Sequence, residues 1–353
     1  MPRALPRLRD FSHIAVVQMA YLGDVALVLP LLQALRELHP TARRMLVVTP
    51  AAVPLAECAE AVDEVLVYDK RGADAGIAGL RRCAQRICRW GAELLLVPHR
   101  SLRTALLTLL SSPRYSVGSY RSALPWVFNA RVPYGWHLHE VERNLSLLAP
   151  FADVGPRWRE LRDIPIALRF PEGAVEQLQH RLRQVGIAPT SPVVVLSPGS
   201  AWATKRWSPH HYASLAWLLR QRGYAVVITG SAAEAALCAS IAERGGALSL
   251  AGELSIPELL LLLQRARCVV GNDSASIHLA ELVGTPVVAI FGPTVPEFGF
   301  APRLPHSRLI ARQLPCRPCS VHGGHRCPIG THACMESISP LEVLQQVLEV
   351  AAE

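Results

Sequence analysis

The strongest constraint on the fold is a series of short apolar segments that alternate with helix-like segments, and the series occurs twice. In the first half of the chain the apolar segments are residues 13–19, 45–49, 64–68 and 93–97. In the second half they are residues 193–197, 224–229, 268–270 and 287–291. Unbroken apolar strands separated by helices are typical of a parallel sheet covered on both faces. The sequence therefore predicts an α/β protein with two doubly wound parallel sheets.

The segment between the two series differs in composition from both of them. Residues 151–171 are rich in proline and arginine and contain no long periodic run. The chain of 353 residues also exceeds one ordinary domain of roughly 150 residues. We predict an N-terminal domain over residues 1–165 and a C-terminal domain over residues 166–338. A final helix is predicted over residues 339–353, because Ser339 and Pro340 form a helix-start signal.

Composition points to a folded protein of the cytosol. Half of the residues are hydrophobic and 18% are charged, which argues against a disordered chain. No apolar run approaches the roughly 18 to 20 residues that span a bilayer. The N-terminal residues contain arginines but no apolar signal core. We therefore expect a cytosolic protein whose nine cysteines are reduced.

The chain is basic, with a net charge of +8. Such a charge attracts nucleic acid, anionic lipid or a phosphorylated substrate. No recognition helix, zinc-knuckle repeat or aromatic-basic strand motif is visible, so we expect no nucleic-acid partner. Lys70 and Lys205 are the only two lysines, which directs attention to the loops that carry them.

The loops that follow the strands are where ligands bind in folds of this class. Neither a G-x-G-x-x-G sequence nor a Walker A sequence is present, which argues against nicotinamide and P-loop chemistry. Asp24 follows the first strand in QMAYLGD. Its carboxylate has two interpretations at this position: a helix cap, or a general base at the edge of a cleft.

Two loops in the second half have the chemistry of an anion site. SPGSAWATKRW contains Ser200, Thr204 and Lys205, which supply two hydroxyls and an ammonium group; the alternative is an ordinary loop with a solvated lysine. GNDSASIH opens a helix that Asp273 or Ser274 caps, and the free amides of such a helix start attract anions. His278 lies one turn into that helix, where a half-buried structural role is the alternative. Glu234 follows a third strand and is a weaker candidate for binding ribose hydroxyls.

Four cysteines near the C-terminus form the pattern C-x2-C-x7-C-x6-C, made by Cys316, Cys319, Cys327 and Cys334. The first pair has zinc-ligand spacing and the second pair does not. We expect no metal here and reduced thiols in an ordered loop, with a structural zinc as the alternative.

Several of these motifs together resemble the bacterial lipopolysaccharide heptosyltransferases of glycosyltransferase family 9. They are LGD after the first strand, PGS with KRW, NDSASIHLAELVGTPVVAIFGPT, and the cysteine-bearing tail. The long NDS segment is the most specific part. The cysteines are similar to those of second-heptose transferases in this family.

The resemblance implies a GT-B fold, with two Rossmann-like domains facing each other and the C-terminal helix packing back on the first. It also implies an inverting transfer of L-glycero-D-manno-heptose from ADP-heptose to the inner core of lipopolysaccharide. Asp24 would be the general base, and Glu234 and Asp273 would bind the donor nucleoside and sugar. The donor phosphates would be bound by Ser200, Thr204, Lys205, Ser274, Ala275, Ser276 and His278. No cofactor or catalytic metal is implied.

The implied acceptor is an anionic glycolipid, either Kdo2-lipid A or its heptosylated form, at the cytoplasmic face of the inner membrane. Arginines that could dock it in the first half are Arg7, Arg9, Arg100, Arg103, Arg114, Arg121 and Arg131. The sequence departs from the family where a glycine often follows Asp-Ser, because Ala275 stands there. An alanine would be strained if that position required a positive φ. Two alternatives stay open: another nucleotide-sugar transferase or epimerase on this fold, and a non-catalytic homologue that binds nucleotide or lipid A precursor.

Overall fold

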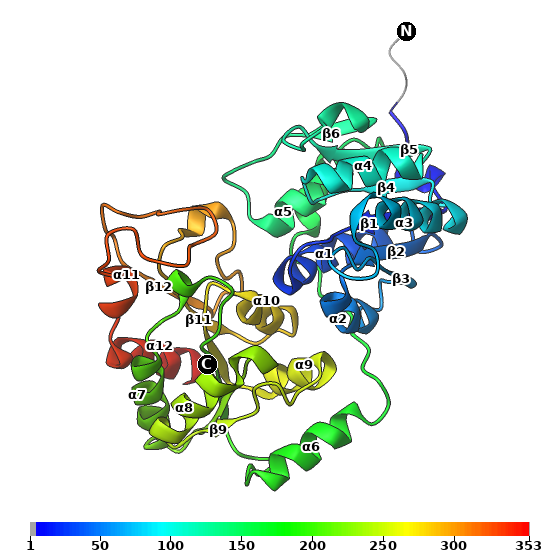
Figure 1. Ribbon diagram of the computed structural model, residues 1–353. Helices are drawn as coiled ribbons and strands as arrows, with labels where there is room; N and C mark the ends of the chain where they lie inside the picture. The colour runs from blue at the N-terminus through cyan, green and yellow to red at the C-terminus, as the bar shows by residue number, and fades with distance from the viewer. Residues whose placement is uncertain (1–4, 353) are drawn as a thin grey trace. The chain divides into compact units, whose positions relative to one another are not determined.

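The computed structural model describes residues 5–352, which divide into two compact units (Figure 1). Unit 1 ends at Arg169 and unit 2 begins at Phe170, where the sequence suggested a boundary after residue 165. The end of the connecting segment belongs to unit 1 because its backbone pairs with the region around Cys58. Ala59 and Leu168 form an antiparallel bridge, and the Arg169 amide donates to the Cys58 carbonyl at 2.8 Å. Residues 1–4, on which part of the signal-peptide expectation rests, lie outside the described residues.

Unit 1 is built on a six-stranded parallel sheet in the order β3-β2-β1-β4-β5-β6. The strands are β1 His13–Val17, β2 Arg43–Val48, β3 Glu64–Val67, β4 Leu94–Leu96, β5 Tyr115–Ser119 and β6 Ala130–Val132. The four predicted strands are confirmed as β1 to β4. The sequence pattern missed β5 and β6, because the first is interrupted by serine and glycine and the second has three residues.

Helices flank this sheet. They are α1 Leu22–Leu38, α2 Val53–Cys58, α3 Gly76–Trp90, α4 Leu102–Ser111 and α5 Glu140–Leu145. Short 3-10 helices are η1 Leu8–Asp10, η2 Pro50–Ala52, η3 Pro125–Val127, η4 Ser146–Leu148 and η5 Gly155–Leu161. Helix α1 is buried over most of its length, which explains why its sequence is apolar on all sides.

Unit 2 repeats the plan with the parallel strand order β12-β11-β10-β7-β8-β9. Its strands are β7 Val193–Ser197, β8 Ala225–Ile228, β9 Leu248–Ser249, β10 Cys268–Asn272, β11 Val287–Phe291 and β12 Arg308–Ala311. The four predicted strands are confirmed as β7, β8, β10 and β11. Helices are α6 Ala174–Gln184, α7 Pro209–Arg220, α8 Ala235–Gly245, α9 Ile256–Arg265, α10 Ala275–Leu282, α11 Ala333–Glu336 and α12 Pro340–Ala352. Its 3-10 helices are η6 Ala203–Lys205, η7 Ala232–Glu234 and η8 Pro296–Phe298.

The predicted final helix is present as α12, which lies against α7 and the adjoining strands of unit 2. Val343, Leu344, Val347 and Val350 are buried in the core of that unit. Packing of α12 on the N-terminal domain stays a prediction. Across residues 5–352, no helix combines the length and the apolar character needed to cross a membrane.

Candidate functional site

Four neighbouring strands of unit 2 end at loops that together form the candidate donor site, and three of these loops carry the predicted residues. In the order β11-β10-β7-β8, they are followed by the loops that contain Thr294, Asp273, Lys205 and Glu234. Because all four strands are parallel, these loops meet at one edge of the sheet (Figure 1). The structure therefore places the two anion-site loops of the sequence beside each other.

Lys205 and Asp273 form the central contact of this edge. The Lys205 Nζ lies 2.6 Å from Asp273 Oδ2, and the two side chains are 12% and 7% exposed. The Thr294 hydroxyl donates to the same carboxylate oxygen at 2.6 Å. Thr294 was missed by the sequence prediction, although the FGPT segment that contains it was part of the resemblance. A buried ion pair with a further hydrogen bond fixes both side chains in one geometry.

The start of α10 supplies backbone amides next to this pair. Ser274 is the N-cap residue in extended backbone, and its hydroxyl lies 3.1 Å from that of Ser276. Asp273 does not cap the helix with its side chain, since that carboxylate is bonded to Lys205 and Thr294. Ala275 is the first helical residue, and it is not among the non-glycine residues with positive φ, so the alanine is unstrained.

His278 lies one turn into α10 and is buried. Burial lowers its pKa to about 4, while Asp273 raises this pKa and Lys205 lowers it. Its Nδ1 atom has no hydrogen-bond partner in the part of the chain that the structure describes. His278 is therefore a neutral imidazole at pH 7, with one ring nitrogen left for a ligand or water.

Asn272 joins the two anion-site loops and was not singled out in the sequence. Its side-chain oxygen accepts from the Trp207 amide at 3.0 Å and the Tyr212 hydroxyl at 3.1 Å. Its side-chain nitrogen donates to the Pro198 carbonyl at 2.8 Å. An amide side chain can serve as donor and acceptor at once, so Asn272 holds the β7 loop in register with β10.

The structure places Ser200 and Thr204 differently. The Ser200 hydroxyl accepts from the Trp202 amide at 3.3 Å, and its carbonyl accepts from Arg206, within the loop after β7. The Thr204 hydroxyl donates to the Gly324 carbonyl at 3.0 Å and accepts from the Gly324 amide at 2.8 Å. Thr204 thus ties the cysteine-containing loop to the site, and its contact with phosphate stays a prediction.

Glu234 lies against the loop after β7. Its carboxylate accepts from the Ser231 amide at 2.9 Å and the Ser231 hydroxyl at 2.8 Å. A Cβ atom placed on Gly199 would come within 2.0 Å of Glu234 Oε1. Glycine at position 199 therefore permits the Glu234 carboxylate to approach the β7 loop.

In unit 1, Asp24 is the third residue of α1. Its Oδ2 accepts from the Tyr21 amide at 3.1 Å, so the capping interpretation is confirmed.

Lys70 follows β3, and its Nζ donates to the Met19 carbonyl in the loop before α1. Burial lowers the pKa of Lys70, as do Arg103 and Arg71, whereas the Asp24 charge raises it. Lys70 and Asp24 therefore interact electrostatically at the carboxyl ends of β1 and β3.

A second carboxylate of unit 1 lies within range of Asp24 and was missed in the sequence. Glu140 accepts from Arg143 Nη1 at 2.5 Å, and the same guanidinium donates to the Tyr134 hydroxyl at 2.8 Å. Burial raises the pKa of Glu140, Arg143 lowers it, and Asp24 raises it further. Glu140 is the first residue of α5. In the sequence it is only an acidic residue at a helix start, and nothing there indicates that it lies near Asp24.

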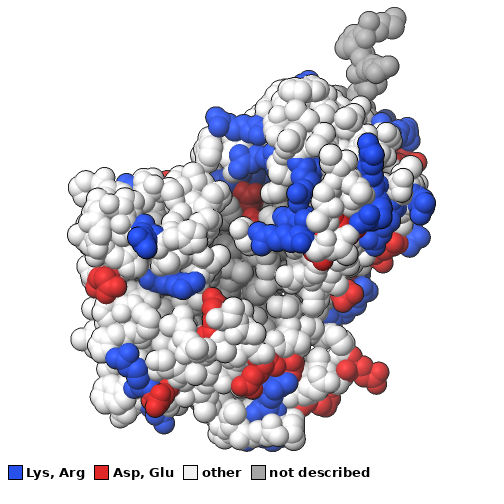
Figure 2. Space-filling view, viewed as in Figure 1, with Lys and Arg blue, Asp and Glu red and all other residues white. Residues whose placement is uncertain are grey.

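The predicted acceptor-docking arginines largely lie against aromatic rings. Guanidinium carbons lie over the rings of four aromatic residues: Arg100 over Tyr134 at 4.0 Å, Arg114 over Phe11 at 5.2 Å, Arg121 over Trp136 at 5.4 Å and Arg131 over Tyr120 at 5.5 Å. Such stacking orients a guanidinium while leaving its edge available to an anion. Figure 2 shows lysine and arginine side chains gathered on this unit. Their role in acceptor docking stays a prediction.

The four clustered cysteines are free thiols in the structure. Cys319, Cys327 and Cys334 line a cavity of about 90 Å³ with His332 and Thr204. Hydrogen bonding from the His332 amide lowers the pKa of Cys327, and burial raises the pKa values of Cys319 and Cys334. Within residues 5–352 no group of three or more His, Cys, Asp or Glu side chains has the geometry to hold a metal ion.

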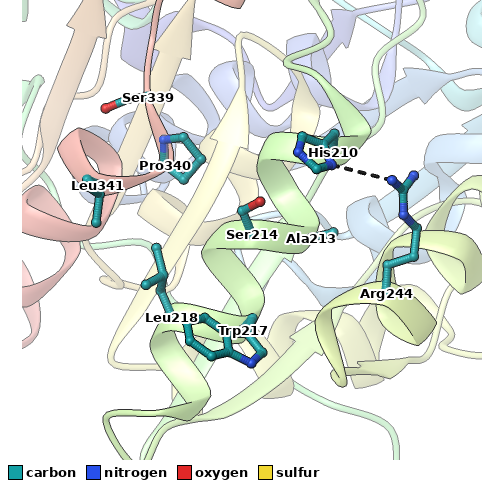
Figure 3. Close-up of a pocket in the computed structure, with 9 residues that line it drawn as sticks. All are labelled: His210, Ala213, Ser214, Trp217, Leu218, Arg244, Ser339, Pro340 and Leu341. Atoms are coloured by element: carbon teal, nitrogen blue, oxygen red, sulfur yellow. Dashed lines mark hydrogen bonds between the residues drawn. The ribbon is translucent and has the colours of Figure 1, made fainter.

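A larger cavity of about 530 Å³ lies elsewhere in unit 2, between α7 and the start of α12 (Figure 3). Trp217, Leu218, Pro340 and Leu341 supply its apolar walls, and the Arg244 guanidinium contacts His210 Nδ1 at 3.4 Å. None of the predicted donor-site residues lines it, so this cavity is separate from the edge formed by the strand ends.

Comparison with known proteins places this arrangement in a family. The model of glycosyltransferase family 9 (heptosyltransferase) matches residues 80–325. Lipooligosaccharide heptosyltransferase 2 of Haemophilus influenzae is 30% identical over 54% of this chain and 58% of its own length. Lipopolysaccharide heptosyltransferase 2 of Escherichia coli is 28% identical over 54% and 56%. The chain thus spans little more than half the length of these two relatives. The Salmonella typhimurium lipopolysaccharide heptosyltransferase 2 is 25% identical over 96% and 99%.

Solved structures resemble the whole chain. A family 9 glycosyl transferase from Veillonella parvula has a TM-score of 0.83 at 21% identity, covering 97% of each chain. ADP-heptose lipopolysaccharide heptosyltransferase II of Escherichia coli has a TM-score of 0.76 at 24% identity, covering 96% of this chain and 98% of that one. The predicted GT-B fold is thereby confirmed. With its match over residues 80–325, the chain belongs to glycosyltransferase family 9, the heptosyltransferase family.

Proposed function

We propose that the protein transfers L-glycero-D-manno-heptose from ADP-heptose to the inner core of lipopolysaccharide, with inversion at the anomeric carbon. The observation that carries the proposal is the cluster made by Lys205, Asp273 and the start of α10 at the strand ends of unit 2. In a member of this family, that cluster is a site for a leaving nucleoside diphosphate.

The proposed donor site is supported by the charge that develops on the leaving diphosphate. Cleavage of the donor leaves negative charge on the diphosphate, and preorganised donors stabilise such charge as it develops. The Lys205 ammonium and the free amides of α10 supply these donors, and Asp273 holds Lys205 in place. The neutral His278 can donate or accept a hydrogen bond without adding charge. Glu234 would accept hydrogen bonds from ribose hydroxyls.

The acceptor half rests on Asp24. Inversion requires a base that takes the proton of the acceptor hydroxyl as its oxygen attacks the anomeric carbon opposite the diphosphate. A carboxylate positioned by the Tyr21 amide at the start of α1 is suited to that role. Lys70 interacts with Asp24, and Arg103 and Arg100 interact with Lys70 and Glu140 in turn. This positive charge would attract an acidic acceptor. No catalytic metal or cofactor is required by this scheme.

The second-heptose type is the more specific part of the proposal. The H. influenzae, E. coli and S. typhimurium relatives are all heptosyltransferases 2, which supports a heptosylated inner-core acceptor. Because such an acceptor is a glycolipid, we also propose peripheral association with the cytoplasmic face of the inner membrane. The basic surface of unit 1 supports this placement.

A transfer assay tests the proposal. The purified chain is incubated with ADP-heptose and either Kdo2-lipid A or its mono-heptosylated form; mass spectrometry counts the added heptoses and NMR reads the anomeric configuration of the product. We expect one added heptose on the heptosylated acceptor, with the anomeric configuration opposite to that of the donor. Transfer to Kdo2-lipid A but not to its heptosylated form would contradict the second-heptose type. Transfer from a uridine-linked sugar but not from ADP-heptose would contradict the proposed donor.

Thermal shift separates the remaining alternatives. ADP should raise the melting temperature and UDP should not, since a binder stabilises the folded state according to its affinity. Stabilisation by ADP-heptose without transfer to either acceptor would indicate a non-catalytic homologue. Stabilisation by UDP-sugars with release of an altered sugar would indicate an epimerase.

A further inference from the structure

Helix α4 of unit 1 exposes an apolar stripe, although its opposite face is already buried in the core. Leu102, Leu109 and Leu110 are 52%, 58% and 43% exposed. Together with the partly buried Leu106 they follow the i, i+4, i+7, i+8 spacing of a single helix face. Ala105 and Leu107 on the other side are fully buried. Contiguous exposed apolar side chains mark an interaction surface, whereas apolar residues scattered singly over a surface do not.

The neighbouring helix α3 is strongly basic. It packs against α4 and contains Arg81, Arg82, Arg86 and Arg89 with no acidic residue between Gly76 and Trp90. Arg82 is paired with Asp74 at 3.2 Å, and Arg86 donates to the Val67 carbonyl at 2.9 Å. Arg81 and Arg89 have no ion pair or hydrogen bond to any residue of the described range. Figure 2 shows blue side chains over the region where Figure 1 places α3.

The short helix η3 contacts α4 and adds an aromatic side chain. Its Trp126 is 70% exposed, which makes it one of the most exposed large apolar residues described. Tryptophan favours the boundary between hydrocarbon and water, because its ring is apolar and its N–H is polar. An exposed tryptophan beside exposed leucines fits a surface that meets lipid.

We propose that this surface, the α3–α4 face, docks on an anionic bilayer; it consists of Arg81, Arg89, Leu102, Leu109, Leu110 and Trp126. The leucines and Trp126 would enter the boundary between headgroups and acyl chains, while the arginines bind anionic headgroups. This deepens the proposed function, on which it rests, because a glycolipid acceptor is presented at such a bilayer.

Charge complementarity selects a bilayer over two other occupants. A second copy bound through the same surface by a two-fold axis would enclose the unpaired arginines of both copies in one interface without supplying an acidic partner from this face. A nucleic acid would meet the arginines but would leave the leucine stripe without a stacking partner, since bases stack on aromatic rings. An anionic bilayer satisfies both the basic helix and the apolar one.

Vesicle co-sedimentation of the full chain tests the proposal. The probes are vesicles of phosphatidylcholine with phosphatidylglycerol and vesicles of phosphatidylcholine alone. We expect stronger binding to the anionic vesicles, with a loss of about tenfold or more in the L109Q/L110Q variant, where two apolar groups are removed from the bilayer. R81Q/R89Q should lose roughly fivefold for each arginine on anionic vesicles and little on neutral ones.

A control substitution in unit 2 and a fluorescence measurement distinguish loss of bilayer binding from a general effect on the protein. Leu341→Gln changes an exposed leucine of unit 2, 64% exposed, and should bind vesicles like the wild type. Quenching of tryptophan fluorescence by brominated lipid should fall in Trp126→Phe. All variants should retain transfer to a deacylated, water-soluble acceptor, so an inactive wild type in that assay would count against the proposed function alone.

Three results would overturn the docking proposal. They are equal binding of the wild type to anionic and neutral vesicles, unchanged binding of L109Q/L110Q, and a dimer by analytical ultracentrifugation that L109Q/L110Q converts to monomer. The last result would identify a second copy of the chain as the occupant of the α3–α4 face.

Discussion

Each unit of the molecule contains a single lysine near an aspartate at the carboxyl ends of its parallel strands, and the two arrangements differ. In unit 2, Lys205 contacts Asp273 directly at 2.6 Å; the Asp273 side chain is buried and that of Lys205 is only 12% exposed. In unit 1, Lys70 donates to the backbone carbonyl of Met19, and Asp24 accepts from the Tyr21 amide at the start of α1. Thus Lys205 is bound by a side-chain carboxylate, whereas Lys70 is bound by a backbone carbonyl.

The difference separates two kinds of chemistry. Asp273 holds the Lys205 ammonium in one position beside the start of α10, where the ammonium and the free amides can donate to an incoming diphosphate. A carboxylate at a helix start, as at Asp24, is oriented by an amide and influenced by Lys70 from a distance. The first arrangement suits the binding of an anion and the second suits the acceptance of a proton, which supports the proposed division of roles.

The largest effect is expected from Asp24→Asn. Removal of a general base should lower kcat by about 10² to 10⁴. The asparagine oxygen can still accept from the Tyr21 amide, so the melting temperature should change little. The measurement is single-turnover transfer followed by mass spectrometry, with ADP affinity determined by calorimetry.

Asp10→Asn is the matched control for that change. Asp10 is the third residue of η1 and accepts from the Arg7 amide at 3.0 Å, which reproduces the capping contact of Asp24. It should retain wild-type kcat. If Asp24→Asn kept more than about a tenth of the activity, or if Asp10→Asn lost as much, Asp24 would be a cap and not a base.

The next largest effects are expected from Lys205→Met in unit 2. Loss of a charged donor should weaken ADP binding by about 10- to 100-fold. It should also lower the free energy of unfolding by about 3 to 5 kcal/mol, because Asp273 is left buried without its partner. Calorimetry with ADP and urea unfolding measure the two effects.

The double variant Lys205→Met/Asp273→Asn separates binding from stability. It should recover much of the lost stability, since no buried charge is left uncompensated, and it should not recover ADP affinity. Lys70→Met in unit 1 should leave ADP affinity unchanged. Recovery of ADP binding in the double variant would exclude Lys205 as the phosphate ligand.

The stability of unit 2 should depend on pH through the buried His278. Burial lowers its pKa in the folded state to about 4, below its usual 6.5. Between pH 4 and pH 6.5 the unfolded chain therefore binds more protons at this histidine than the folded protein does. The stability that the neutral His278 contributes is complete above pH 6.5 and is lost as the pH falls toward 4. The loss should approach about 3 kcal/mol for a fully buried imidazole.

Urea midpoints measured between pH 7 and pH 4 in wild type and His278→Gln test this. The variant should show a shallower decline with falling pH. Burial also lowers the pKa of His99 in unit 1 to about 4, with Lys70 and Arg100 adding to the effect. His99→Gln should flatten the decline in the same direction, and a parallel pH dependence of all three proteins would contradict the assignment.

The smallest effect is expected from Gly199→Ala. The new Cβ would displace the Glu234 carboxylate from the β7 loop, which should weaken ADP binding by roughly 2- to 10-fold, the value of one hydrogen bond. Glu234→Gln should show a similar loss. The double variant should lose little more than either single change, because both act on one contact; full additivity would separate Gly199 from Glu234.

Long apolar strands and the loops after them were predictable from the sequence, whereas short strands were not. The segments that became β7 and β11 were predicted with their observed bounds, since they consist almost entirely of β-branched and other apolar residues. Strand β9 has two residues and β12 begins with arginine, so neither shows a run or alternation of apolar residues long enough to be recognised as a strand. Their strand state is imposed by pairing with β8 and β11.

The candidate site divides in the same way. Asp24, Lys205 and the segment from Asp273 to His278 were identifiable because each follows an apolar strand and precedes a helix. Asn272 and Thr294 were not singled out, since the groups that their side chains contact lie far away in sequence. Glu140 was not singled out because only the fold brings it within range of Asp24. Likewise, nothing in a single sequence showed that the Thr204 hydroxyl is bonded to Gly324.

Local sequence patterns specify two parallel sheets and the loops at their carboxyl ends, because hydrophobic periodicity and turn residues act over short stretches of chain. Long-range packing makes Asp273 pair with Lys205 and Thr294 and not with the start of its own helix, and it places the Lys70 ammonium against the Met19 carbonyl. The physical reason is that strand order brings together loops separated by tens of residues. Burial at the sheet edge then makes each polar group depend on partners that its neighbours in the chain do not specify.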